Sequence, residues 1–113
     1  MPTRKPATLV DACVICAQAC ETCADACLKE SDVAKRTECI RLDLDCAALC
    51  WTGASLLSRG SRFTSDILAL CSDACRECAA ECRRHPLDHC RECAEACEEC
   101  AAECRKVSAV GRT

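Results

Sequence analysis

The chain has almost none of the large apolar and aromatic residues that fill an ordinary protein core. Trp51 and Phe63 are its only aromatic residues, tyrosine is absent, and Met1 is its only methionine. Glycine and proline are also scarce, with three of each in 113 residues. Three glycines leave no glycine-rich phosphate loop, and no segment alternates like a strand. The length allows one domain, spanning 1–113, but an ordinary large-residue core is excluded.

An excess of charge of one sign is lacking as well. Fifteen Lys and Arg against 18 Asp and Glu give a net charge of −3 without a basic stripe. A nucleic-acid partner is therefore not expected. No stretch approaches the roughly 18 uncharged apolar residues of a membrane helix, so no membrane association is expected.

Features of secretion and of catalysis are missing too. The segment 1–7 carries two charges and two prolines, and no apolar run follows before Asp11, so we expect no signal peptide. This favours a cytoplasmic protein with reduced thiols. No Ser/His/Asp set or paired carboxylates can be identified, which predicts that the protein is not an enzyme.

Cysteine, in contrast, is abundant: 17 of 113 residues, or about 15%, above the roughly 8–10% that marks a cysteine-based design. The cysteines form four groups, in which every step is 3, 4 or 7 residues. Alternating steps of 3 and 4 average about 3.5 residues, the period of the seam in a helical bundle. The groups are Cys13, Cys16, Cys20, Cys23 and Cys27; Cys39, Cys46 and Cys50; Cys71, Cys75, Cys78 and Cys82; and Cys90, Cys93, Cys97, Cys100 and Cys104.

Four stripes predict four helices and an all-α fold. Short connections favour antiparallel neighbours, hence an up-down-up-down four-helix bundle with a cysteine-lined core. The expected helices cover residues 7–29, 32–58, 62–84 and 86–107. Alanine follows cysteine at six positions, and such small residues would let the helices approach closely around a narrow tube of sulfur.

Residues at the expected helix ends agree with this count. Gly60 breaks the chain between the second and third stripes. Ser31 and Asp32 are expected to cap the second helix. Pro86 suits the first turn of the fourth helix, which makes His85 its expected cap.

Several explanations of so many cysteines compete. Free cysteine packs as a small hydrophobe, but 17 of them would sacrifice core volume. Disulfides fit poorly because 17 is odd and neighbours on one helix are not set for the required torsion. A structural zinc site needs four ligands at a turn. The ligand run of bacterial iron–sulfur proteins is absent, since these steps are helical.

An array of thiolates favours soft ions, above all Cu(I). Cysteines three or four residues apart on a helix have Cβ atoms about 5–6 Å apart, close enough to share an ion. If each thiolate bridges two ions, the capacity is on the order of one copper per cysteine. The pattern therefore predicts Cu(I) storage. An iron–sulfur or thiol redox protein, or a general store for zinc or cadmium, remains an alternative.

The sequence resembles the cytosolic branch of the cysteine-lined four-helix-bundle copper storage proteins. The likeness lies in the ladder of the first helix, in Asp45-Cys46-Ala47, and in the cysteines around His85 and His89, and it covers roughly residues 9–106. The resemblance implies reversible binding of many Cu(I) ions in each bundle and assembly into a homotetramer. One position departs from it: the register of the second stripe predicts a cysteine at 43, where this chain has Asp43. Asp43 is expected to be either a weak ligand or local counter-charge, or a residue that turns to water or pairs with an arginine.

The two ends of the expected bundle differ. His85 and His89 would lie at one end beside Cys27, Cys39, Cys82 and Cys90, and we expect copper to pass there, with both histidines as first, weaker ligands. The other end would be plugged by apolar residues, namely Leu9, Leu57, Ile67 or Leu68, and Val107. Apolar residues outside the seams predict an oligomer contact through the first two helices. These residues are Val14, Ile15, Ile40, Leu44 and Trp51.

Overall fold

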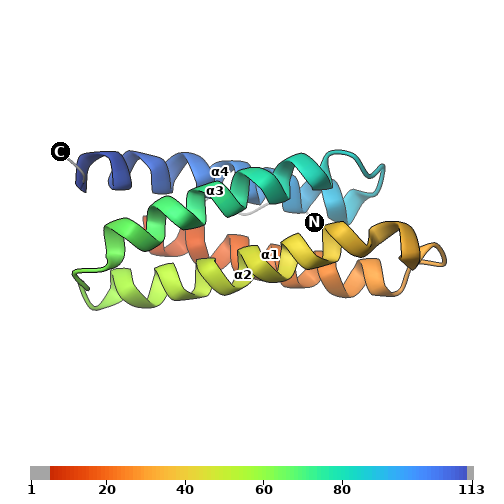
Figure 1. Ribbon diagram of the computed structural model, residues 1–113, viewed down its shortest axis with the longest axis horizontal. Coiled ribbons are helices and arrows are strands. Elements are labelled where there is room, and N and C mark those ends of the chain that lie inside the picture. The colour runs from red at the N-terminus through yellow and green to blue at the C-terminus, as the bar shows by residue number, and fades with distance from the viewer. Residues whose placement is uncertain (1–5, 112–113) are drawn as a thin grey trace.

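The chain folds into four α-helices and one short 3-10 helix within residues 6–111, the part that the computed structural model describes. The helices are α1 (Leu9–Leu28), α2 (Thr37–Ser58), α3 (Thr64–Cys82) and α4 (Asp88–Gly111), and the 3-10 helix η1 (Val33–Arg36) precedes α2. No strand occurs in this range. Successive helices run in opposite directions (Figure 1), which confirms the predicted all-α, up-down-up-down bundle. Residues 1–5, on which the expectation about a signal peptide partly depends, lie outside the described residues.

The helices stand at the corners of a square. In the described part of the chain, α1 packs along α2 and α4, and α3 packs along α2 and α4. The diagonal pairs meet through side chains in the core, as where the sulfurs of Cys16 and Cys75 lie 3.8 Å apart. The bundle measures 46 × 24 × 19 Å. The α1–α2 and α3–α4 connections lie together at one end, and the α2–α3 connection lies at the other (Figure 1). No described helix is both long and apolar enough to cross a bilayer.

Two helix ends follow directly from the sequence. Thr8 caps α1, because its Oγ1 accepts a hydrogen bond from the backbone N–H of Asp11 at 3.0 Å. At the end of α2, Gly60 has a φ of 62°, a left-handed conformation that favours glycine. The N–H groups of Gly60 and Ser61 donate to the carbonyls of Leu57 and Leu56, which is a Schellman motif.

Two expected caps are wrong. His85 does not cap α4, because this helix begins at Asp88 and Pro86 stands before it. Asp32 does not cap α2 either: η1 intervenes, and the side chain of Asp32 makes no capping hydrogen bond. The Asp32 carboxylate pairs with Arg36 instead, at 2.7 Å. Both side chains are thereby free for the contacts at this end of the bundle.

Sulfur forms the core. All 17 cysteines are at most 1% exposed, and the alanines that follow them are buried beside them. Such small neighbours let the helix backbones approach, so the seams enclose thiols rather than a cavity of large side chains. The predicted cysteine-lined interior is confirmed.

Candidate metal centre

The thiols form a continuous column through the bundle. The Sγ atoms of Cys50 and Cys71, and of Cys46 and Cys75, lie 3.5 Å apart. Every cysteine is a free thiol, and these separations far exceed the roughly 2.05 Å of a disulfide bond. An ion bonded to two sulfurs at about 2.3 Å, the Zn–S distance, would span up to about 4.6 Å. The column is therefore spaced for metal bridges.

Groups of four thiols recur along this column, each with its sulfur atoms within 4.8 Å of one another. The three middle groups share members, so bound ions there would share thiolates rather than occupy isolated sites. Cys82 joins the column through Cys39, at 3.7 Å between sulfurs. The groups are Cys13, Cys71, Cys100 and Cys104; Cys16, Cys46, Cys50 and Cys75; Cys16, Cys20, Cys46 and Cys97; Cys20, Cys78, Cys93 and Cys97; and Cys23, Cys27, Cys39 and Cys90.

Asp43 points into the column. Its side chain is fully buried, and Oδ1 accepts from the thiols of Cys78 at 3.1 Å and Cys93 at 3.3 Å. Cys82 and Cys39 approach the same carboxyl at 3.7 and 3.9 Å. Burial raises its pKa from 3.8 to about 8. The alternative that Asp43 turns to water is wrong: the register argument placed it correctly in the seam.

The mouth is the end of the bundle where Cys27, Cys39, Cys82 and Cys90 lie under the α1–α2 and α3–α4 connections. His89 faces these thiols: its Nδ1 lies 3.6 Å from the sulfurs of Cys23 and Cys90 and 3.9 Å from that of Cys27. Its Nε2 is buried without a hydrogen-bond partner. An imidazole nitrogen directed at three thiols is well placed to share a soft ion with them.

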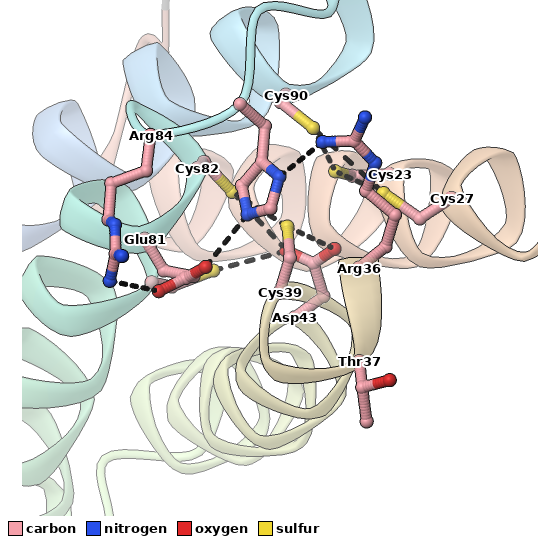
Figure 2. A network of polar contacts seen from close by, with 12 residues as sticks. Cys23, Cys27, Arg36, Thr37, Cys39, Asp43, Glu81, Cys82, Arg84 and Cys90 are labelled. Atoms are coloured by element: carbon pink, nitrogen blue, oxygen red, sulfur yellow. Dashed lines mark hydrogen bonds and ion pairs between the residues drawn. The ribbon is translucent and has the colours of Figure 1, made fainter. Parts of the chain in front are cut away.

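His85 lies at the same end but is differently engaged. Its Nε2 hydrogen-bonds Glu81 at 2.7 Å, and its Nδ1 hydrogen-bonds the guanidinium of Arg36. Figure 2 shows this network beside Cys27, Cys39 and Cys90. A surface pocket of about 290 Å³ opens here, and its lining includes Cys82 and His85. The two predicted histidines therefore share the mouth, but only His89 has a ring nitrogen within hydrogen-bond distance of the described thiols.

The closed end is the opposite one, beside the α2–α3 connection. Leu68 is fully buried there, Leu56 is 9% exposed, and Leu9 and Leu57 pack partly buried against the core. Val107 is 41% exposed, so its expected place in the plug is wrong. The plug is apolar, as predicted, but smaller.

Burial keeps the thiols of Cys27 and Cys90 at the mouth protonated. It raises the pKa of Cys27 to about 11 and also raises that of Cys90. A metal ion must therefore displace protons to bind here, and binding becomes tighter as pH rises.

Arg36 and Glu81 are the mouth residues that sequence reasoning missed. The pairs Asp32/Arg36 and Glu81/His85 both have the i, i+4 spacing of helical ion pairs, which was a visible indication of local contact. Contact between the two pairs depends on how the α1–α2 and α3–α4 connections meet in the folded chain, and residue spacing in the sequence cannot predict this.

The model of the copper storage protein family matches residues 3–109. The chain belongs to the copper storage protein family. A Cu(I)-bound copper storage protein, BsCsp3, is 41% identical, with a TM-score of 0.85 over 88% of this chain and 94% of that one. A cytosolic copper storage protein from Streptomyces lividans, solved with five coppers, is 45% identical, with a TM-score of 0.86 over 89% of each chain. No curated protein sequence matches.

The relatives also indicate the capacity of such bundles. The Streptomyces lividans protein has been solved loaded with 10 copper equivalents, at 45% identity and a TM-score of 0.86 over 89% of this chain and 81% of that one. Membership of the copper storage family thus agrees with the repeated thiol groups described above.

Proposed function

We propose that the chain stores Cu(I) along its thiol column, with all 17 cysteines as ligands, and that His85 and His89 receive the ion at the mouth. The observation that carries this proposal is the overlap of the four-thiol groups, each within 4.8 Å. Overlap lets thiolates bridge ions, which gives a capacity on the order of one copper per cysteine. Storage requires no chemical conversion, so we propose no enzymatic role.

The mouth is the proposed route for copper. The pocket beside Cys82 and His85 reaches the surface there, whereas Leu68 and its apolar neighbours fill the opposite end. His89 would hold an arriving ion beside Cys23, Cys27 and Cys90 before it moves into the all-sulfur column.

We place the protein in the cytoplasm as a homotetramer formed through α1 and α2. A cytosolic relative supports the location, and reduced thiols fit a cytosol. For assembly, Leu44 is 52% exposed and Trp51 is 38% exposed, which leaves apolar surface on α2. Sizing by light scattering at micromolar concentration tests this, and a monomer would contradict it.

Anaerobic titration of the reduced protein with Cu(I), followed by competition with a high-affinity chelator, tests storage. We expect a colourless product with near-ultraviolet sulfur-to-metal absorption that saturates above about ten ions per chain. Saturation near one ion would reject storage, and a brown product after aerobic purification would favour an iron–sulfur protein.

A further inference from the structure

A chain of polar contacts crosses the mouth from one connection to the other. Arg36, in η1, donates from Nε and Nη2 to the carboxylate of Asp32 at 3.2 and 2.7 Å. Its Nη1 meets Nδ1 of His85, and Nε2 of His85 meets Glu81 at 2.7 Å. The three inner side chains are largely buried, with 12% of Arg36, 8% of His85 and 14% of Glu81 exposed.

The partners of His85 fix its tautomer. A guanidinium has only hydrogen-bond donors, so Nδ1 of His85 must accept from Arg36. The proton of the neutral ring is then on Nε2, which donates to the carboxylate of Glu81. Both ring nitrogens are thus used, and no lone pair of His85 is available to a metal ion.

We propose that Arg36 is a positioning residue that gates the mouth by occupying the metal-binding nitrogen of His85. An arriving Cu(I) ion can use Nδ1 only after the guanidinium leaves it. The two hydrogen bonds to Asp32 keep Arg36 anchored while it does so, because they do not involve Nη1. The inference rests on the proposed copper storage and adds a gate to its mouth.

His89 provides the internal contrast. Its Nδ1 lies against three thiols, and its buried Nε2 has no partner, so no described side chain competes with copper for it. The gate therefore acts on His85, the histidine that lines the surface pocket. His89 faces the thiols and is not blocked by Arg36.

A gate of this kind changes rates and leaves capacity alone. The hydrogen bonds of Arg36 go to Asp32 and His85 and to none of the cysteines of the four-thiol groups, so removing Arg36 leaves those ligands in place. The same displacement precedes both loading and removal, so both rates should change in the same direction. A metal ligand would behave differently, since its loss lowers capacity or affinity.

The test compares Arg36→Leu with Arg76→Leu, because leucine has neither a donor nor a soft ligand atom. Arg76 pairs with Asp73 at 2.7 Å on the surface of α3 and matches the Arg36–Asp32 pair in length. Loading from a Cu(I)–acetonitrile complex and removal by bathocuproine disulfonate are followed in the near-ultraviolet. We expect about tenfold faster loading and removal for Arg36→Leu alone, the factor that one charge-assisted hydrogen bond corresponds to.

Two backgrounds make the outcome decisive. In His85→Ala, adding Arg36→Leu should change neither rate, and a further tenfold gain there would overturn the proposal in favour of simple steric blocking. Unchanged rates in Arg36→Leu, or an equal gain in Arg76→Leu, would also overturn it. In Arg36→Lys, which keeps a donor, the rates should fall between those of the wild type and Arg36→Leu.

A measurement on the unaltered protein tests the gate without any variant. Nitrogen-15 NMR of the copper-free protein should find His85 as the neutral tautomer protonated at Nε2, with Nδ1 unprotonated. A proton on Nδ1 would overturn the proposal. Failure of storage itself would be distinguishable, because it would show as low copper capacity in the wild type, whereas failure of the gate leaves capacity normal.

Discussion

The two halves of the bundle have the same 3-4 spacing of cysteines, but apolar side chains cover one end of the thiol column and polar side chains cover the other. At the closed end, Leu68 and its leucine neighbours fill the space between the helices by apolar packing. At the mouth, Asp43 and His89 lie among the thiols, and polar contacts cover them. Opening an apolar plug exposes buried apolar surface to water, which is unfavourable. Opening a polar contact costs less, because its hydrogen bonds can be exchanged for bonds to water or to a metal ion. We therefore expect the closed end to stay shut and the mouth to open.

The largest expected effect that separates the halves is the pH dependence carried by Asp43. Its pKa is about 8 in the folded protein against an ordinary 3.8, so folding takes up a proton between these values. Its contribution to stability is therefore complete below about pH 4 and is lost as pH rises through about 8. About 1.4 kcal/mol per pKa unit makes the total on the order of 6 kcal/mol.

The variant Asp43→Asn removes this ionisation while keeping the size of the side chain. The free energy of unfolding of the wild type should fall relative to that of Asp43→Asn as pH rises from about 4 to about 8. Urea unfolding of the reduced, copper-free proteins, followed by circular dichroism, measures both free energies of unfolding. The titrations of the thiols contribute to both proteins and cancel in the difference. Parallel pH profiles would contradict the burial of an ionisable carboxyl in the mouth half.

At the closed end the corresponding change is Leu68→Ala. Leu68 is fully buried, and truncating such a leucine costs about 2–5 kcal/mol through lost burial and the cavity left behind. Urea unfolding at about pH 5 should show this loss without any change in its pH dependence. Exposed Leu70, also on α3 and 52% exposed, supplies the control, since Leu70→Ala should change stability little. An equal loss in both variants would mean that the plug is not what seals this end.

A smaller effect, on rates, is expected from the histidines of the mouth. Replacing both His85 and His89 with alanine removes the nitrogens that we propose receive copper first, and should slow its transfer about tenfold, the effect of losing about 1.4 kcal/mol of interaction. Total capacity should change little, because the thiol groups remain. Stopped-flow loading measures the rate, and chelator competition measures the capacity. Unchanged transfer would mean that copper does not pass the histidines.

The sulfur column was predictable because it depends only on helical period. Steps of 3 and 4 residues place side chains on one face whatever surrounds them, so all 17 cysteines were assigned to the core correctly. The same register put position 43 in the seam, although the direction of the Asp43 side chain was left open. The sequence likewise located the four helices, and their ends differ from the expected ones by a few residues. The exception is the second helix, where η1 takes the place of the first turn expected before Thr37.

The mouth was less predictable because it depends on two connections that meet only in the folded chain. Pro86 and His85 suggested a helix start, yet α4 begins at Asp88, and His85 is drawn into contact with Arg36. Local preference for a cap is worth only about 1 kcal/mol, and tertiary hydrogen bonds to a buried imidazole outweigh it. Spacing thus predicted that both histidines share the mouth, but not which of them is free to bind a metal.

The smallest expected effect lies at the closed end, at Gly53 of α2. A Cβ added there would lie 3.4 Å from Cδ2 of Leu68 and 3.6 Å from the sulfur of Cys13, which is ordinary van der Waals contact. Alanine is also favoured over glycine within a helix by about 0.5–1 kcal/mol. Gly53→Ala should therefore raise the free energy of unfolding by up to about 1 kcal/mol. Copper loading should be unchanged, because the mouth is at the other end. Slower loading, measured by stopped flow, would show that copper also passes the leucine plug. The conclusion that only the mouth admits copper would then be wrong.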